Sequence, residues 1–265
     1  MLFLVLINDA LASVGPRCWK YVDDMTIAES TLRGAASEVQ VTLNTLDRWC
    51  TENNMRLNVN KCHAMRVYFS KTILQPLHLT IGNQVLEQID SVRVLGVLIQ
   101  CNLKWEDHIQ QIVIKANGRV HMLRQLIPFN LPRSDLITIY IGYIRPLLEY
   151  AAPVWHPALT QSQTQQIERV QKRVLRLILG NQYQTYEIAT SLAQLETLSD
   201  RRKRLCLKFA QSLVKSPQFH HWLPLNNAIP RNLRKRNPFK EVKCKTDRFK
   251  NSPIPFFTRL LNTHK

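Results

Sequence analysis

Two adjacent aspartates, Asp23 and Asp24, stand between two short β-prone runs within residues 18–28. Such runs around a short polar stretch predict a β-hairpin with both carboxylates at its tip. Mg²⁺ prefers oxygen ligands and keeps several waters, so a few carboxylates suffice for nucleotidyl transfer by two metal ions. An ordinary solvated turn is the alternative, because turns are rich in aspartate. The aromatic and apolar residues ahead of the pair, 19–22, favour the metal-binding interpretation.

The elements expected around this hairpin form a small α/β unit. Apolar residues at steps of three and four predict a helix over residues 31–53. Alternating apolar residues predict strands over 55–69 and 77–99, with a turn at Gly82-Asn83, in an antiparallel sheet with hairpins. We expect the unit to end near residues 100–105.

The rest of the chain is expected to be helical, and the fold class is therefore α+β. Apolar stripes predict helices over about 105–126, 134–148, 162–179 and 198–214. After Pro217, five prolines lie among basic residues, which predicts a loosely ordered basic tail. The expected domains are residues 1–104, 105–216 and 217–265.

Positive charge is concentrated in the second part of the chain. Residues 161–265 carry 21 Lys+Arg against 6 Asp+Glu, whereas residues 1–160 carry 15 against 13. A field of this sign attracts phosphate backbones or anionic membranes, although a solvated basic surface is the simpler alternative. The basic run at the start of the fourth helix could be a phosphate contact or a solvated face, and 231–236 could be a nuclear address or a nucleic-acid patch. The run consists of Arg201, Arg202, Lys203 and Arg204.

Several classes of protein are disfavoured. The six cysteines contain no CxxC pair and no finger-like spacing with histidine, so reduced thiols in an intracellular protein, nuclear or cytoplasmic, are expected. The seven glycines form no phosphate-binding loop. The apolar start, residues 1–7, is too short to cross a bilayer and has no cleavage signal, so we interpret it as the end of a buried helix and expect neither secretion nor a membrane partner.

The motif Tyr21-Val22-Asp23-Asp24 resembles the (F/Y)xDD box of reverse transcriptases. Its surroundings resemble the enzymes of non-LTR retrotransposons, in the jockey-like or related groups, and the matching blocks follow one another in the family's order over about residues 1–215. These blocks are residues 2–9, 49–62, 94–108, 143–155 and 167–173.

The resemblance implies roles for particular residues. Asp23 would be the principal metal ligand and Asp24 its weaker partner, while Tyr21 would lie against the primer or the incoming nucleotide. Lys61 matches a lysine proposed to protonate the leaving pyrophosphate. Leu95-Gly96 would belong to the primer grip. The helices of residues 105–179 would form a thumb that follows the primer–template duplex through backbone contacts.

The resemblance thus implies a partial polymerase palm followed by an all-helical, thumb-like region. RNA template, DNA primer and dNTP would be its partners, and no oligomeric state is predicted. The family's first catalytic aspartate and its fingers are expected upstream of residue 1, so we expect Mg²⁺ only if a third carboxylate is supplied, and no polymerase activity from this chain alone.

Two alternatives remain. The chain could be a non-catalytic nucleic-acid-binding protein that uses its basic C-terminal helices. It could also retain no function, because a truncated palm exposes a sheet edge.

Overall fold

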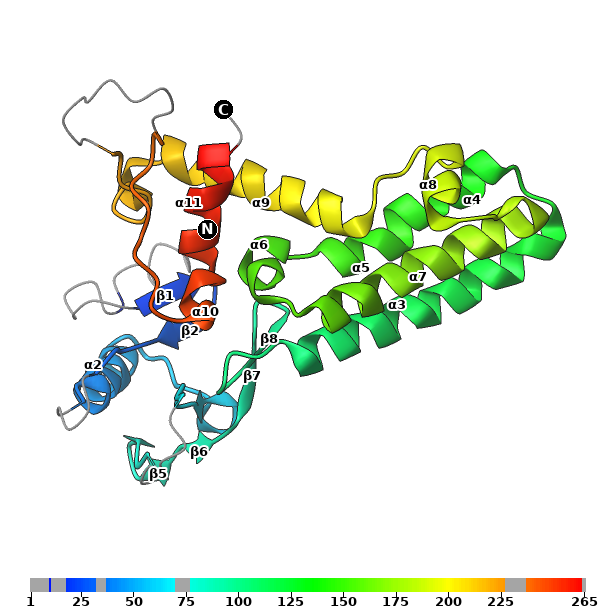
Figure 1. Ribbon diagram of the computed structural model, residues 1–265. Coiled ribbons are helices and arrows are strands. Elements are labelled where there is room, and N and C mark those ends of the chain that lie inside the picture. The colour runs from blue at the N-terminus through cyan, green and yellow to red at the C-terminus, as the bar shows by residue number, and fades with distance from the viewer. Residues whose placement is uncertain (1–9, 11–17, 32–36, 70–76, 227–236, 264–265) are drawn as a thin grey trace, which may run out of the picture. The chain divides into compact units, whose positions relative to one another are not determined.

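The computed structural model describes residues 10, 18–31, 37–69, 77–226 and 237–263 (Figure 1). The chain forms two compact units. The first contains residues 1–94 and 100–103, and the second contains residues 95–99 and 104–265. The helix end expected at residues 1–7 and the basic stretch 231–236 lie outside the described residues.

The first unit begins with the predicted hairpin, which packs on a helix. Strands β1 (Cys18–Tyr21) and β2 (Asp24–Ile27) pair antiparallel, and helix α2 spans Val39–Glu52. One face of the hairpin contributes Cys18, Met25 and Ile27 to a cluster with Leu46 and Cys50 of α2. Burial of these apolar side chains fixes the hairpin on the helix, since removal of apolar surface from water is the main driving force for packing.

The strands of the rest of the first unit are shorter than the alternation predicted. β4 and β5 form the expected hairpin, with Gly82 at a φ of +54° in its turn. β3 and β6 pair in parallel, so the expectation of a wholly antiparallel sheet is wrong. Alternation identifies extended backbone, but it does not identify the strand that pairs with it. The elements are η1 (Val59–Lys61), β3 (His63–Ala64), β4 (Thr80–Ile81), β5 (Gln84–Val85), β6 (Glu87–Gln88) and β7 (Ser91–Val94).

Long helices dominate the second unit, as predicted. The expected second helix contains a π-helical turn, η3, between α4 and α5, and the chain adds the short helices α6 and α8, which the sequence did not predict. The elements are β8 (Val97–Gln100), α3 (Glu106–Leu126), η2 (Ile127–Phe129), α4 (Arg133–Ile139), η3 (Tyr140–Ile144), α5 (Arg145–Glu149), α6 (Ala152–Trp155), η4 (His156–Ala158), α7 (Gln161–Leu179), η5 (Gly180–Gln182), α8 (Tyr186–Leu192) and α9 (Leu198–Lys215).

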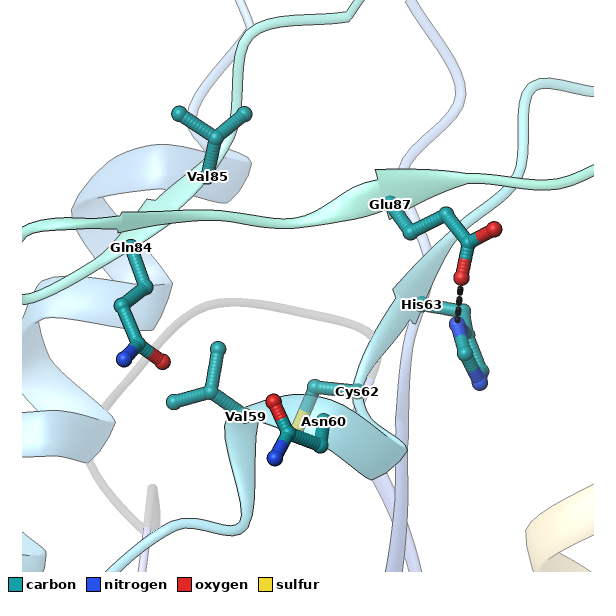
Figure 2. A pocket seen from close by; sticks show the side chains of 7 residues that line it. All are labelled: Val59, Asn60, Cys62, His63, Gln84, Val85 and Glu87. Carbon is teal, nitrogen blue, oxygen red and sulfur yellow. Dashed lines mark ion pairs between the residues drawn. The ribbon is translucent and has the colours of Figure 1, made fainter.

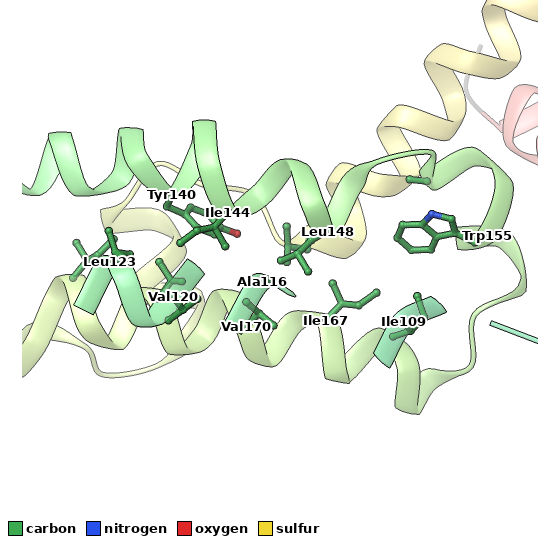
Figure 3. Close-up of a cluster of buried hydrophobic side chains, with 14 of the residues drawn as sticks. Ile109, Ala116, Val120, Leu123, Tyr140, Ile144, Leu148, Trp155, Ile167 and Val170 are labelled. Carbon is green, nitrogen blue, oxygen red and sulfur yellow. The ribbon is translucent and has the colours of Figure 1, made fainter. Parts of the chain in front are cut away.

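The apolar stripes of these helices meet in one core, as Figure 3 shows. Ile109 and Ala116 of α3 lie opposite Ile167 and Val170 of α7, and Trp155 closes one end of the cluster. The stripe predicted for α3 is confirmed, because its residues at steps of three and four are the ones that α3 buries.

Within the second unit, the C-terminal region packs on helix α9. Helix α11 (Pro253–Thr263) lies beside α9 (Figure 1), and Phe257 and Leu261 are buried with Cys206 and Leu213 of α9. The expectation of a loosely ordered tail is therefore wrong for residues 253–263. The prolines precede the apolar stripe or lie in the first turn of the helix, where proline is tolerated. The remaining elements are η6 (Pro217–Phe219) and α10 (Asp247–Lys250). None of the helices in the described residues combines the length and the apolarity needed to cross a membrane.

Candidate functional site

The hairpin places the two aspartates at and beside its turn. Tyr21 and Asp24 are the last antiparallel pair, so Val22 and Asp23 form the two-residue turn between them. Val22 adopts a φ of +58°, in the left-handed region that β-branched residues rarely enter. Strained backbone of this kind is concentrated at functional sites, where the surrounding structure holds it in place. Two-residue hairpin turns take a positive φ at one or both of their central residues, so the turn geometry itself places Val22 in this region.

The two faces of the hairpin differ in exposure. Cys18, Lys20, Met25 and Ile27 are half-buried, whereas Trp19, Tyr21, Asp24 and Thr26 are exposed. Side chains directly opposite each other in an antiparallel pair lie on the same face. Asp24 therefore shares the outer face with Tyr21, and Asp23 is exposed at the tip. Both carboxylates are open to solvent.

Within the described residues, Asp23 and Asp24 are not joined by further side chains that could ligate a metal ion. Nowhere in the ranges that the structure describes do three or more His, Cys, Asp or Glu side chains gather in a group able to hold a metal ion. Asp23 and Asp24 alone fit a Mg²⁺ ion that is bound by one or two carboxylates and takes its other ligands from water and substrate phosphates. They do not form a closed protein site.

Lys61 is exposed at the end of η1, and no hydrogen bond or ion pair among the described residues joins it to Asp23 or Asp24. Next to it, an open hollow of about 400 Å³ lies between η1 and the strands β5 and β6 (Figure 2). His63 Nδ1 lies 3.5 Å from Glu87 Oε2 at its edge. Burial raises the pKa of the Cys62 thiol, so this thiol is a poor nucleophile. The hollow has no evident chemistry.

Leu95 and Gly96 form a turn that is fixed within the second unit. Their φ angles are +45° and +83°. The Tyr150 hydroxyl donates a 2.8 Å hydrogen bond to the Leu95 carbonyl oxygen, and a Cβ atom at Gly96 would lie 3.3 Å from Tyr150 Cε1. Trp155 Nε1 in turn donates to the Tyr150 carbonyl oxygen at 2.9 Å. The proposed primer-grip turn is thus held by residues 143–155, another of the blocks that resemble the reverse transcriptase family.

The basic run at the start of α9 is largely paired with carboxylates. Arg201 forms a two-pronged ion pair with Glu149, Lys203 Nζ lies 3.7 Å from Asp200 Oδ1, and Arg204 Nη2 lies 3.1 Å from Glu196 Oε2. Arg202 has no exposed surface. The prediction of a phosphate contact is therefore wrong for Arg202, because α9 turns this side chain into the core. For Arg201, Lys203 and Arg204 it stays a prediction.

Arg202 belongs to a buried polar cluster between α7, α9 and η4. Its Nη2 lies 4.0 Å from Glu168 Oε1, and its Nε donates to His156 Nδ1 at 3.5 Å. Burial lowers the pKa of the Arg202 guanidinium. Burial and the nearby Arg202 cation lower the pKa of His156 to about 4, so this imidazole is neutral near pH 7. Glu168 also accepts hydrogen bonds from the backbone N–H groups of Leu198 and Ser199 at the start of α9. The cluster holds helices together.

An arginine stripe on α7 was missed by the sequence reasoning. Arg169, Arg173 and Arg176 are exposed and follow steps of four and three, opposite the buried stripe of the same helix. None of the three forms an ion pair with any carboxylate in the described part of the chain. Arg173 Nη1 donates to Asn117 Oδ1 of α3 at 3.0 Å, and Arg176 lies over the ring of Tyr183. Their spacing outside the apolar stripe was the signal that could have revealed them.

Comparison with known proteins places this chain among relatives of RNA-directed DNA polymerases from mobile elements. The RNA-directed DNA polymerase from mobile element jockey is 24% identical over 203 residues in Drosophila funebris and 24% identical over 206 residues in Drosophila melanogaster, covering 74% of this chain and 22% of the relative in both cases. The probable RNA-directed DNA polymerase from transposon X-element of Drosophila melanogaster is 25% identical over 223 residues, covering 79% of this chain and 24% of the relative.

The similarity supports a protein related to the reverse transcriptases of non-LTR retrotransposons. The chain spans less than a quarter of the length of these relatives. No family model matches the chain. No solved structure matches it either.

Proposed function

We propose that this chain is the palm and thumb portion of a retrotransposon reverse transcriptase. The observation that carries the proposal is the strained hairpin, which presents Asp23 and Asp24 to solvent within the motif Tyr21-Val22-Asp23-Asp24. The similarity to RNA-directed DNA polymerases, which covers about three quarters of the chain, supports it. The first unit then corresponds to part of the palm and the helices of the second unit to the thumb.

In this proposal the chain contributes two of the carboxylates that bind the catalytic metal. Bound Mg²⁺ would stabilise the charge that develops on the transferred phosphoryl group. Tyr21 lies on the same face as Asp24 and would contact the primer end or the incoming nucleotide. Lys61 would donate a proton to pyrophosphate. Described residues offer no third carboxylate beside the pair, so another segment or a partner must supply it.

The helices of the second unit would hold the primer–template duplex. Arg169, Arg173 and Arg176 form a row of guanidinium groups along α7. Among the described residues, none of the three forms an ion pair with a carboxylate. Guanidinium groups bind phosphate oxygens well, and such contacts position a duplex without reading its sequence. This stripe, rather than the run at the start of α9, is the better candidate for the phosphate contact.

RNA-templated primer extension with Mg²⁺ tests the catalytic proposal. We expect no extension by the isolated chain, because the described residues bring only Asp23 and Asp24 to the site. A chimera in which this chain replaces the matching region of the jockey polymerase should extend the primer, and Asp23→Asn should abolish that extension. Undiminished extension by the Asp23→Asn chimera would exclude the proposed role of the hairpin.

A non-catalytic nucleic-acid-binding protein is the second candidate, and the arginine stripe of α7 favours it. Binding to an RNA–DNA duplex would then be salt-dependent and would survive the double substitution Asp23→Asn/Asp24→Asn. Equal affinity at low and high salt would count against phosphate contacts in either candidate, because phosphate contacts release counterions.

A further inference from the structure

The C-terminal basic segment, residues 240–250, is anchored to the helical unit at both ends. Phe239 N donates to Asn262 Oδ1 at 3.1 Å, and Asn262 Nδ2 donates back to the Phe239 carbonyl oxygen at 3.1 Å. Lys240 N donates to the Pro224 carbonyl oxygen at 2.9 Å. At the other end, Arg259 Nη2 donates to the Lys250 carbonyl oxygen at 2.7 Å. These hydrogen bonds hold both ends of the segment in place on the helical unit.

The lysine side chains of this segment are open to solvent. Lys240, Lys243, Lys245 and Lys250 are all exposed, and within the described residues none of them lies at ion-pair distance from a carboxylate. The acid Glu241 instead accepts hydrogen bonds from the side chains of two asparagines, 237 and 262. Exposed cations that lack an acidic partner attract polyanions.

Phe249 gives the same segment an exposed aromatic ring. Its side chain is 45% exposed, whereas Phe257, eight positions later, is 2% exposed in the core. Phe249 N donates to Thr246 Oγ1 at 3.2 Å, and Ser252 Oγ donates to the Phe249 carbonyl oxygen at 2.7 Å, so the backbone that carries the ring is fixed. Lysines near an exposed aromatic ring on an ordered backbone can bind single-stranded nucleic acid. The lysines contact the phosphates, and an unpaired base stacks on the ring.

We propose that the C-terminal basic segment binds single-stranded nucleic acid, with its lysines on the phosphates and Phe249 stacked on a base. The inference goes beyond the proposed function, since it requires neither Asp23 and Asp24 nor the arginine stripe of α7. A duplex would meet the lysines but would not offer Phe249 an open base face. The surface should therefore distinguish single strands from duplexes.

The lysine contribution is tested by the salt dependence of binding to a fluorescein-labelled oligodeoxythymidylate. In the full chain, Lys243→Gln/Lys245→Gln should reduce the slope of log affinity against log salt by about 1.4, since each single-strand phosphate contact contributes about 0.7. The matched control is Arg48→Gln/Arg56→Gln, which removes the same charge from exposed positions of the first unit and should leave the slope nearly unchanged. Equal slope changes in the two pairs would overturn the lysine assignment.

Phe249→Leu tests the stacking contribution, because it keeps an apolar side chain and removes the ring. Affinity for the oligodeoxythymidylate should fall roughly tenfold, while affinity for a duplex of the same length stays unchanged. A loss shared equally by single strand and duplex, or no loss at all, would refute the proposal. An equal loss of binding to phosphatidylserine vesicles would also refute it, because the segment would then be a general anion surface. If any of these results is found while Arg169→Gln/Arg176→Gln still weakens duplex binding, this inference fails and the proposed function stands.

Discussion

The hydroxyl of Tyr150 donates a 2.8 Å hydrogen bond to the carbonyl oxygen of Leu95, 55 residues earlier in the chain. Together with the 3.3 Å approach of its ring to the Cβ position of Gly96, this contact holds a turn with two positive φ angles against the helical unit. Glycine enters that backbone region at little cost, whereas leucine does so only when other contacts hold it there.

Tyr150→Phe should loosen this turn without unfolding the helical unit. The substitution removes the hydroxyl and keeps the ring, so we expect a loss of about 0.5–1 kcal/mol of unfolding free energy, which is typical of one hydrogen bond. Hydrogen exchange of the amides around the Leu95-Gly96 turn should become faster, while amides of α3 should keep their protection. Unchanged exchange at the turn would show that Tyr150 does not hold it.

Val22→Gly should stabilise the hairpin. The left-handed φ of +58° is strained for valine and accessible to glycine. Because glycine also loses more backbone entropy on folding, we expect a net gain of no more than about 1 kcal/mol, measured by urea unfolding. The control is Val41→Gly at an exposed position of α2, which should destabilise the chain by about 0.3–0.5 kcal/mol, because valine already has a lower helix propensity than alanine. A loss of stability in both variants would contradict the strain at Val22.

His156 should make the stability of the second unit depend on pH. Its pKa is lowered to about 4 by burial and by Arg202, from an ordinary value near 6.5, so between these pH values the unfolded chain binds more protons than the folded chain. The contribution of the neutral His156 to the unfolding free energy is fully present above about pH 6.5. It is lost as the pH falls toward 4, with a magnitude of up to about 3 kcal/mol.

Thermal melts between pH 7 and pH 4 measure this effect. His156→Gln should flatten the fall of melting temperature in that window relative to the unsubstituted chain. His78→Gln, at an exposed position, is the control and should leave the pH profile unchanged. Identical profiles for all three chains would rule out a buried neutral imidazole at position 156.

Arg169→Gln/Arg176→Gln should weaken binding to an RNA–DNA duplex and reduce its salt dependence. Each lost phosphate contact lowers the slope of log affinity against log salt by about 0.9 for a duplex, so the pair should lower it by about 1.8. Arg173 is left in place because it bonds Asn117 across to α3, and its removal would also disturb packing. Fluorescence anisotropy at several salt concentrations measures the slope, with Arg48→Gln/Arg56→Gln as the charge-matched control. A slope equal to that of the control would exclude the stripe from the interface.

The sequence by itself determined the features that arise from neighbouring residues. Spacing of apolar residues located α3, α7 and α9, and the aspartate pair between two β-prone runs located the hairpin and its turn. These predictions succeeded because helical and strand periodicity express which face of an element is buried. The motif order also led to the family to which the comparisons point.

Only the tertiary structure decided which side chains meet across the chain. Glu149 and Arg201 pair although 52 positions separate them, and Arg202 is buried while its neighbour Lys203 is exposed. The parallel pairing of β3 with β6 and the packing of α11 on α9 were likewise not predicted. A run of like charges looks uniform in sequence, but a helix turns each successive residue by about 100°. The partner of each residue is therefore set by whatever packs on that side of the helix.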